Sequence, residues 1–316
     1  MTDLAPSSQR FSDALRALLP PEDAPATAYP ASFRRVAELL LLRTTWFMGT
    51  VPHRFTEVEF YWNGRNHGDT FTHSDPMQRD FGHWYHHRTG GEYRGGTYKG
   101  LDIAFGAPDV AAGILIRGVE RLDGDRALID GPCMCVDHLL ALTSSPSVQS
   151  LAESFNRSVD APASGTSPSY LVLSDTPHAA PGVFESTRVG LTLKRGASEA
   201  RQRFVAMPYR FLSEPSRIKK GRLNLVVSLH RQGMSAGEIA KLTGSTAAQI
   251  AKYAAQYEAG KGLDPKTFNK DLGNDELCQL FGACDGLVKA MLGSSAKPQG
   301  AQLGLDLGAA KGPSAG

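Results

Sequence analysis

The chain has 316 residues, a length that fits one large domain or two modest ones. Its content of 41% hydrophobic and 21% charged residues is that of an ordinary globular protein with a buried core. The net charge of +2 does not by itself indicate a polyanionic partner, although ten Lys and Arg face two acids between Arg188 and Arg222. No apolar run is long enough for a membrane span, and MTDLAPSSQR lacks a signal-peptide pattern. We therefore expect a cytoplasmic protein without membrane contact.

The four cysteines are expected to be reduced thiols. Cys133 and Cys135 are separated by one residue, which suits neither a zinc-binding CxxC pair nor an easy disulfide. Cys278 and Cys284 complete the set. Cytoplasmic proteins keep such thiols reduced, so we expect no disulfide framework.

In chain order, residues 1–30 are rich in Pro, Ala and Ser and are expected to form a flexible N-terminal arm. Phe33–Leu42 has helical spacing, and the segment 44–48 leads to a strand at 55–61. Further strands are expected at 101–105, 113–119, 128–130, 170–174 and 189–193, with a helix after Gly131 and Pro132, a surface connection at 144–168 and a mixed segment at 203–212. Short strands with a few helices indicate an α+β domain over 31–215.

From Arg222 the pattern becomes helical. Ser235 with Glu238 three residues later has the spacing of a capping box, Gly244 ends that helix, and Ser245 is expected to cap the next. Two short helices after a third are typical of a helix-turn-helix, so 216–262 is predicted to be a basic loop and helix-turn-helix module, with 263–293 a C-terminal helix and 294–316 a disordered tail. DNA contacts are expected from Arg217, Lys219, Lys220 and Arg222. The alternative is a three-helix packing module that does not touch nucleic acid.

The stretch from Thr56 to Asp102 has the densest concentration of chemically useful side chains. It holds five of the chain's nine histidines and many Tyr and Trp residues. Strand alternation places Glu57, Glu59 and Tyr61 on one face and their neighbours on the other. Taken singly, each of these residues is more often structural than functional. Arg117 lies in the apolar run GILIRG, where an arginine is costly without a partner.

The order of several short motifs resembles the alkyladenine (3-methyladenine) DNA glycosylase family. The motifs EVEFY, DTFTH, GLDIAF, GILIRGVERLDG, DGPCMCVDHLLAL, TRVGL and MPYRF run in sequence between residues 57 and 211. The resemblance covers about residues 30–212 and implies a mixed domain around a curved antiparallel sheet, which flips a damaged base into a pocket. The helix-turn-helix segment lies outside it.

The resemblance also assigns roles to single residues. Glu59, two residues before Tyr61, matches the catalytic glutamate, and Tyr61 matches a tyrosine that stacks on the flipped base. The other matches are His73 for the base-contacting histidine, Tyr93 for the second stacking aromatic with Tyr98 as competitor, and Arg117 for the arginine near the attacking water. Asp102 stands where the family has an asparagine that screens out normal purines. No residue clearly matches the one that the family inserts into the DNA stack.

These assignments predict a monofunctional DNA glycosylase that uses water and acts as a monomer on double-stranded DNA containing a modified base. Glu59 would stabilise positive charge on the sugar and take a proton from water, while Arg117 keeps the carboxylate ionised. Trp84 is a further candidate for the aromatic cage around the base. No cofactor or metal is expected. The predicted substrate is hypermodified (glucosylated hydroxymethylcytosine) phage DNA in antiviral defence, and the competitor is repair of alkylated purines by base excision.

Two other classes remain open. The first is a metal-dependent hydrolase, although its histidines have no familiar ligand spacing. The histidines concerned are His67, His73, His83, His86 and His87. The second is a non-enzymatic DNA-binding regulator, in which the helix-turn-helix binds DNA and the larger domain senses a ligand.

Overall fold

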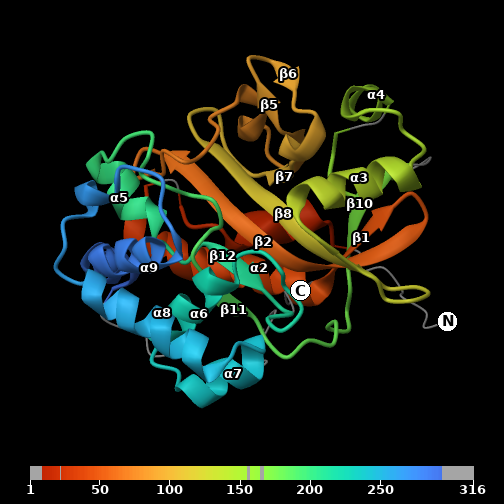
Figure 1. Cartoon of the computed structure of the whole chain (residues 1–316). Helices are drawn as coiled ribbons and strands as arrows, with labels where there is room; N and C mark the ends of the chain where they lie inside the picture. Colours follow the sequence, from red (N-terminus) through yellow and green to blue (C-terminus); the bar gives the residue numbers. More distant parts are fainter. Residues whose placement is uncertain (1–8, 22, 155–156, 164–166, 294–316) are drawn as a thin grey trace, which may run out of the picture.

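The computed structural model describes residues 9–21, 23–154, 157–163 and 167–293. The chain is a mixed α+β protein with a large antiparallel sheet, as expected (Figure 1). Its strands are β1 (Thr44–Met48), β2 (Val51–Gly64), β3 (His67–Gly68), β4 (His83–His86), β7 (Leu101–Ala104), β8 (Ala111–Arg121), β9 (Leu128–Asp130), β10 (Ser169–Leu173), β11 (Phe184–Ser186) and β12 (Arg210–Leu212), with β5 (Arg88–Thr89) and β6 (Glu92–Tyr93) forming a separate hairpin. The main path across the sheet is β10-β1-β2-β8-β7-β4.

Strand β2 is the centre of the sheet because it pairs with β1, β3, β8 and β12. Its pairing with β8 shifts register on either side of Glu57, which marks β-bulges. Such bulges bend a strand and turn side chains toward a chosen face. The bulge leaves Arg117 between the paired residues Ile116 and Gly118, next to the glutamates of β2.

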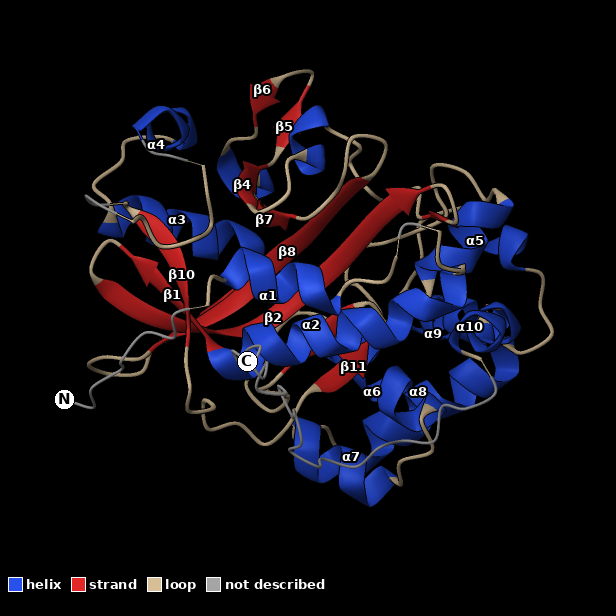
Figure 2. Ribbon diagram, turned by 180° about the vertical axis from the view of Figure 1, so that it is seen from behind, coloured by secondary structure: helices blue, strands red, loops and turns tan. Residues whose placement is uncertain are grey.

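One face of the central sheet is apolar and covered by helices. Val58, Phe60 and Trp62 of β2 are buried in the core, and Phe33 of α2 (Tyr29–Arg43) stacks on Phe60 at 4.9 Å. Helices α1 (Phe11–Leu18) and α2 lie in front of the sheet when the molecule is seen from behind (Figure 2). The alternation in β2 predicted these faces, because successive side chains of a strand point in opposite directions.

The remaining helices surround the other parts of the sheet. Helix α3 (Pro132–Leu142) packs on β8, and α4 (Val148–Ser154) follows it. The C-terminal part holds α5 (Glu199–Val205), α6 (Arg222–Arg231), α7 (Ala236–Thr243), α8 (Ala247–Gly260), α9 (Asn274–Ala283) and α10 (Asp285–Leu292). Short 3₁₀ turns lie at Ala26–Ala28, Pro76–Arg79, Gly96–Tyr98 and Pro265–Phe268. Helix α6 lies against β11 on one side and against α7, α8 and α9 on the others, so it joins the C-terminal helices to the sheet.

Several expectations for single elements need correction. The segment expected as a flexible arm forms α1 from Phe11 onward, because Phe11 and Leu15 are buried against the core. Residues 1–8 and the tail 294–316 lie outside the described residues. No strand spans 189–193, and the nearest one is β11. The single C-terminal helix is two, α9 and α10. The capping box of Ser235 and Glu238 is confirmed, but Thr246 caps α8 in place of Ser245.

Two other expectations hold. All four cysteines are free thiols. No helix in the described part of the chain is both long and apolar enough to cross a bilayer.

Candidate functional site

The second face of the sheet is polar, and it carries most of the residues predicted to act. Neighbouring strands place Arg210, Glu59, Leu115, Asp102 and Tyr85 opposite one another, in one row across β12, β2, β8, β7 and β4. Directly opposed residues of an antiparallel sheet share a face. Glu59 and Asp102, which are 43 positions apart in the sequence, are therefore separated in this row only by Leu115.

The carboxylate of Glu59 is held by two hydrogen-bond donors and one ion pair. Its Oε1 accepts a hydrogen bond from the Val189 amide at 2.8 Å and lies 3.4 Å from the Arg117 guanidinium. Its Oε2 accepts from the Tyr61 hydroxyl at 2.8 Å. Glu59 is 0% exposed, whereas Tyr61 is half-buried. A substrate that reacts at Glu59 therefore requires a side chain that covers it to move.

Glu57 has a different environment, because it is bound by two arginines. Its Oε1 accepts from Arg117 at 2.5 Å and from Arg210 at 2.8 Å. Burial alone would raise the pKa of the Glu57 carboxyl, but the charges of Arg210 and Arg117 outweigh burial and hold this pKa below its ordinary value. Burial likewise opposes the charge of Arg117, but Glu59 and Glu57 raise its pKa. The two arginines and two glutamates form a buried set with no net charge.

A second ion pair lies beneath Tyr61, and sequence reasoning did not find it. Arg188 and Asp69 are both fully buried and paired at 2.5 Å. Arg188 also donates to the carbonyl of Phe60 at 3.0 Å, and its guanidinium lies 4.5 Å from the centre of the Tyr61 ring. Both residues occur in motifs that the sequence singles out, DTFTH and TRVGL, but nothing in the sequence shows that these motifs meet. Arg188 and the buried Arg210 are thus structural and do not face solvent.

The Asp102 carboxylate belongs to a polar cluster at the end of the row. Asp102 is 2% exposed, accepts a hydrogen bond from His87 at 2.7 Å and lies 3.3 Å from the amide nitrogen of Gln78. His73 is exposed, and its Nδ1 lies 3.3 Å from the Tyr85 hydroxyl. The rings of His73 and His87 are in edge contact at 4.4 Å. His73 and Asp102 therefore lie close together although β4 separates them in the sequence.

The glycine at position 113 makes room for this cluster. A Cβ atom there would lie 2.3 Å from the Asp102 carboxylate, closer than any real contact. Gly113 is also the cross-strand partner of Tyr61. A side chain at this position would fill the space between Tyr61 and Asp102.

The aromatic candidates are divided among three environments. Trp84 is fully buried and stacks on Trp46 in the core, so the expectation that it lines a base cage is wrong. Tyr93 is half-buried, next to His86, and lines a pocket of about 340 Å³ between the β5–β6 hairpin and helices α3 and α4. Tyr98 is 76% exposed on the 3₁₀ turn that follows the hairpin. Tyr61 is the one aromatic of this group in contact with Glu59.

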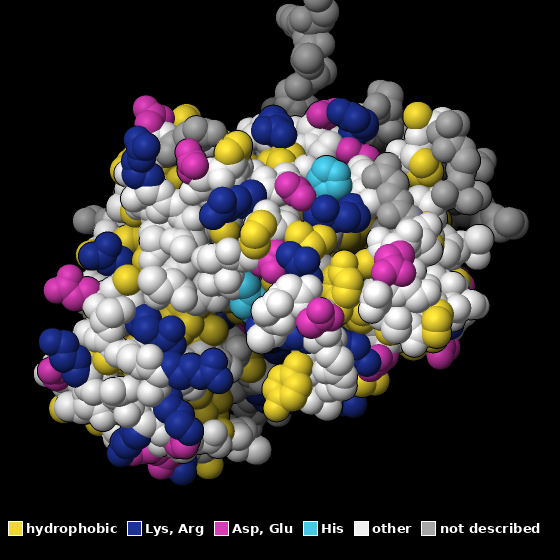
Figure 3. Space-filling view, turned by 90° about the horizontal axis from the view of Figure 1, so that it is seen from above, with side chains coloured by type: hydrophobic (Ala, Val, Ile, Leu, Met, Phe, Trp, Pro, Cys, Tyr) yellow, Lys and Arg dark blue, Asp and Glu magenta, His cyan; other side chains and the backbone are white. Residues whose placement is uncertain are grey.

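The four residues expected to bind DNA differ in how free their side chains are. Arg217 pairs with Glu120 at 2.5 Å, and Arg222 donates to the carbonyls of Thr243 and Ile218. Lys219 and Lys220 are exposed. Seen from above, the surface is hollowed between the part formed by the hairpin and the part formed by α5 and the helices after it (Figure 3). Lys and Arg side chains gather on the second of these parts.

The histidines do not converge on one point. His67 is buried between the carbonyl of Trp62 and the Tyr209 hydroxyl, whereas His83 contacts the carbonyl of Phe81. Within the described ranges no group of three or more His, Cys, Asp or Glu side chains is arranged to hold a metal ion. The geometry of these residues gives the metal-dependent hydrolase no support.

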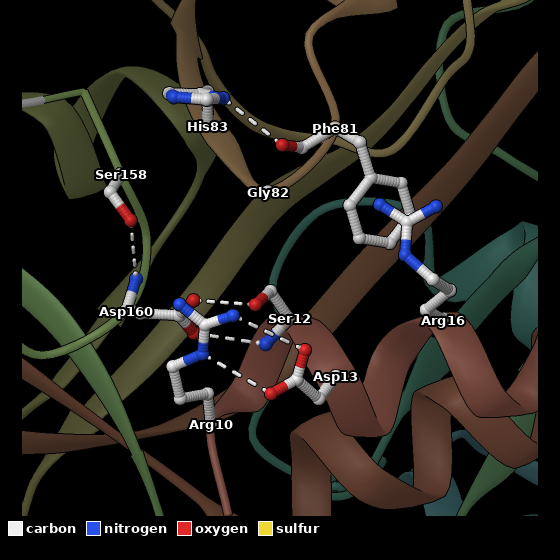
Figure 4. Close-up of a pocket in the computed structure, with 9 residues that line it drawn as sticks. All are labelled: Arg10, Ser12, Asp13, Arg16, Phe81, Gly82, His83, Ser158 and Asp160. Atoms are coloured by element: carbon white, nitrogen blue, oxygen red, sulfur yellow. Dashed lines mark hydrogen bonds and ion pairs between the residues drawn. The ribbon is translucent and has the colours of Figure 1, made fainter.

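A pocket of about 350 Å³ lies at the N-terminus of α1, away from the polar row (Figure 4). Its polar groups satisfy one another: Ser12 donates to Asp160 through both its backbone amide and its hydroxyl, and Arg10 pairs with Asp13. Arg16 lies over the ring of Phe81 at 3.8 Å. Of the residues proposed from the sequence only His83, a candidate for the metal-dependent hydrolase, lines this pocket, and none of the residues assigned to the glycosylase does.

Comparisons with known proteins identify no family. No family model matches the sequence. A stretch of 101 residues is 38% identical to an uncharacterized protein of Acanthamoeba polyphaga mimivirus, over 28% of this chain and 46% of the viral protein. The chain thus matches less than half the length of that relative, whose name indicates no activity.

Proposed function

We propose that the protein is a DNA glycosylase that hydrolyses the N-glycosidic bond of a modified base and leaves an abasic site. One observation carries the proposal: a buried carboxylate, Glu59, is fixed by Tyr61, Val189 and Arg117 on the polar face of the sheet. A carboxylate in such a setting can stabilise the positive charge that develops on the sugar as the base leaves. The order of motifs that resembles the alkyladenine glycosylases supports the same reading.

The reaction assigns one role to each of these groups. Glu59 accepts a proton from water, the oxygen of that water bonds to C1′ of the deoxyribose, and the base departs with the electron pair of the broken bond. Arg117 lies 3.4 Å from Glu59 and places a positive charge beside this carboxylate. Movement of Tyr61, which is half-buried, opens the carboxylate and presents an aromatic face to the flipped base.

Under this proposal the flipped base lies along the polar row. Neighbouring strands lie about 4.8 Å apart, so Glu59 and Asp102 are about 10 Å apart across two strand intervals. This distance accommodates a base whose sugar lies at Glu59 and whose far edge meets Asp102, with Leu115 beneath it. An ionised aspartate accepts hydrogen bonds and does not donate them, so it fits an exocyclic amino group.

Two substrates satisfy this requirement. Glucosylated hydroxymethylcytosine has an exocyclic amino group and is the substrate we propose first, in antiviral defence. Alkylated purines in repair are the second candidate, because the buried negative charge of Asp102 also suits a cationic alkylated base.

The test is release of bases from defined DNA. Phage DNA containing glucosylated hydroxymethylcytosine, alkylated DNA and unmodified DNA are incubated with the protein, and abasic sites are scored after alkali. We expect strand breaks with a modified DNA, and their loss in Glu59→Gln by a factor of about 10²–10⁴. Glu185→Gln, a substitution of a glutamate that pairs with Arg34 outside the polar row, is the matched control. Release from neither modified DNA excludes a glycosylase, and DNA binding without release favours a regulator.

A further inference from the structure

Helix α6 forms hydrogen bonds to the segment 187–189, which faces the candidate catalytic carboxylate of Glu59. The Ser228 hydroxyl accepts a hydrogen bond from the Thr187 amide at 3.0 Å. The Asn224 side chain donates to the Thr187 hydroxyl at 3.0 Å and to the Arg188 carbonyl at 3.1 Å. All four residues are buried. The next residue in this segment is Val189, whose amide donates to Glu59.

The residue immediately before α6 lies against the same segment. Gly221 precedes α6 with a φ of +72°, and a Cβ atom there would lie 2.3 Å from Val189 Cγ2 and 2.7 Å from Arg210 Nη1. Arg210 also donates to the Gly221 carbonyl at 2.9 Å while its Nε binds Glu57. The N-terminal end of α6 is thus packed against groups that hold both glutamates of β2.

We infer that α6 positions the Val189 amide against Glu59, and that Asn224 and Ser228 are positioning residues for base release. The inference rests on the proposed function. Neither residue touches Glu59, so each acts through the backbone of 187–189. Small displacements of an oriented catalytic group lower the rate strongly, whereas binding of DNA elsewhere on the surface is unaffected. Helix α6 therefore supports the candidate catalytic carboxylate from outside, in addition to being part of a candidate DNA-binding module.

The test uses the full chain with Asn224→Leu and Ser228→Ala. The first variant removes two hydrogen bonds and keeps the branched shape of the side chain, and the second removes one acceptor and remains informative if the first does not fold. Tyr257→Phe is the matched control, because it removes a buried hydrogen bond to Asp285 within the same helices and does not contact 187–189. Three quantities are measured: the single-turnover rate of base release, the affinity for DNA, and hydrogen exchange of the Val189 amide.

We expect the rate to fall between about tenfold and a hundredfold in both test variants, with unchanged DNA affinity and faster exchange at Val189. Tyr257→Phe should retain the wild-type rate and Val189 protection. A wild-type rate in folded Asn224→Leu and Ser228→Ala overturns the inference, as does an equal loss in Tyr257→Phe. Exchange at Val189 needs no substrate, so unchanged protection refutes the positioning role by itself. Absence of base release by the wild-type protein refutes the proposed function instead.

Discussion

The two glutamates of β2 should respond differently to the same substitution. Glu57→Gln removes a charge that neutralises two buried guanidinium groups, those of Arg117 and Arg210, at 2.5 and 2.8 Å. Removing one partner of a buried ion pair costs about 3–5 kcal/mol. Glu59 has one arginine beside it, Arg117 at 3.4 Å, and its two hydrogen bonds come from the neutral donors Tyr61 and Val189, so Glu59→Gln should cost less, about 1–2 kcal/mol.

The difference can be measured by urea unfolding followed by circular dichroism. The pKa of Glu57 is lowered in the folded protein, so its contribution to the free energy of unfolding is complete above the ordinary value of 4.5 and is lost as the pH falls through the depressed value. The gap between wild type and Glu57→Gln should therefore be constant near neutral pH and shrink in acid. The rate of base release should rank the two variants in the opposite way, with the larger loss of rate in Glu59→Gln.

The control is Glu185→Gln, which breaks a half-buried pair with Arg34 and should cost less than about 1 kcal/mol. An equal loss of stability in Glu57→Gln and Glu185→Gln would refute the reasoning, because the buried set of charges would then contribute no more than a peripheral pair. A gap between wild type and Glu57→Gln that widens in acid would refute it as well.

Three further predictions concern the surface and α6. Replacing Lys219 and Lys220 by alanine should leave stability unchanged and reduce the slope of log K for DNA against log salt concentration by about 2; an unchanged slope would show that neither lysine meets a phosphate. Tyr98→Ala should not alter the free energy of unfolding, since Tyr98 is 76% exposed. A ring that enters the base stack would make this variant slower on duplex DNA than on single-stranded DNA, and equal slowing on both would exclude that role. Gly221→Ala should lower the free energy of unfolding by more than Gly233→Ala does. Gly233 has a similar positive φ but lies in open space, so its substitution should cost about 1–2 kcal/mol. Equal losses would mean that the Val189 side chain moves aside for the added methyl group at little cost.

The local patterns of the sequence predicted the strands that form the site but not the contacts that bury it. Alternation in β2 placed Glu57, Glu59 and Tyr61 on one face, and their contacts agree. Their burial depends on Arg117 and Arg210, which are 60 and 153 positions from Glu57. A periodicity in one segment has no information about partners at such separations, so the alternation alone did not predict that the two carboxylates are buried.

The incorrect expectations have the same physical origin. Val189 and Leu193 alternate like a strand, but the Val189 amide binds a carboxylate, and among the residues that the structure describes no strand pairs with this segment. Trp84 lies in a run of polar residues, yet its ring packs between strands in the core. The tertiary environment overrides local preference in both cases. The cap of α8 was missed by one residue, because Ser245 and Thr246 are both N-cap residues and serine is the more favoured of the two.

The central position of β2 has a consequence for synthesis of the protein. Glu57 leaves the ribosome long before Arg210, which follows it by 153 residues, and the α6 residues that hold 187–189 come later still. Before these segments emerge, Glu57 has Arg117 but lacks its second arginine partner, and burial of incompletely paired charges is unfavourable. Closure of the sheet around β2 must wait for the C-terminal third of the chain, so shortened translation products should lack a formed site. Under the proposed function, incomplete chains would therefore not release bases from DNA.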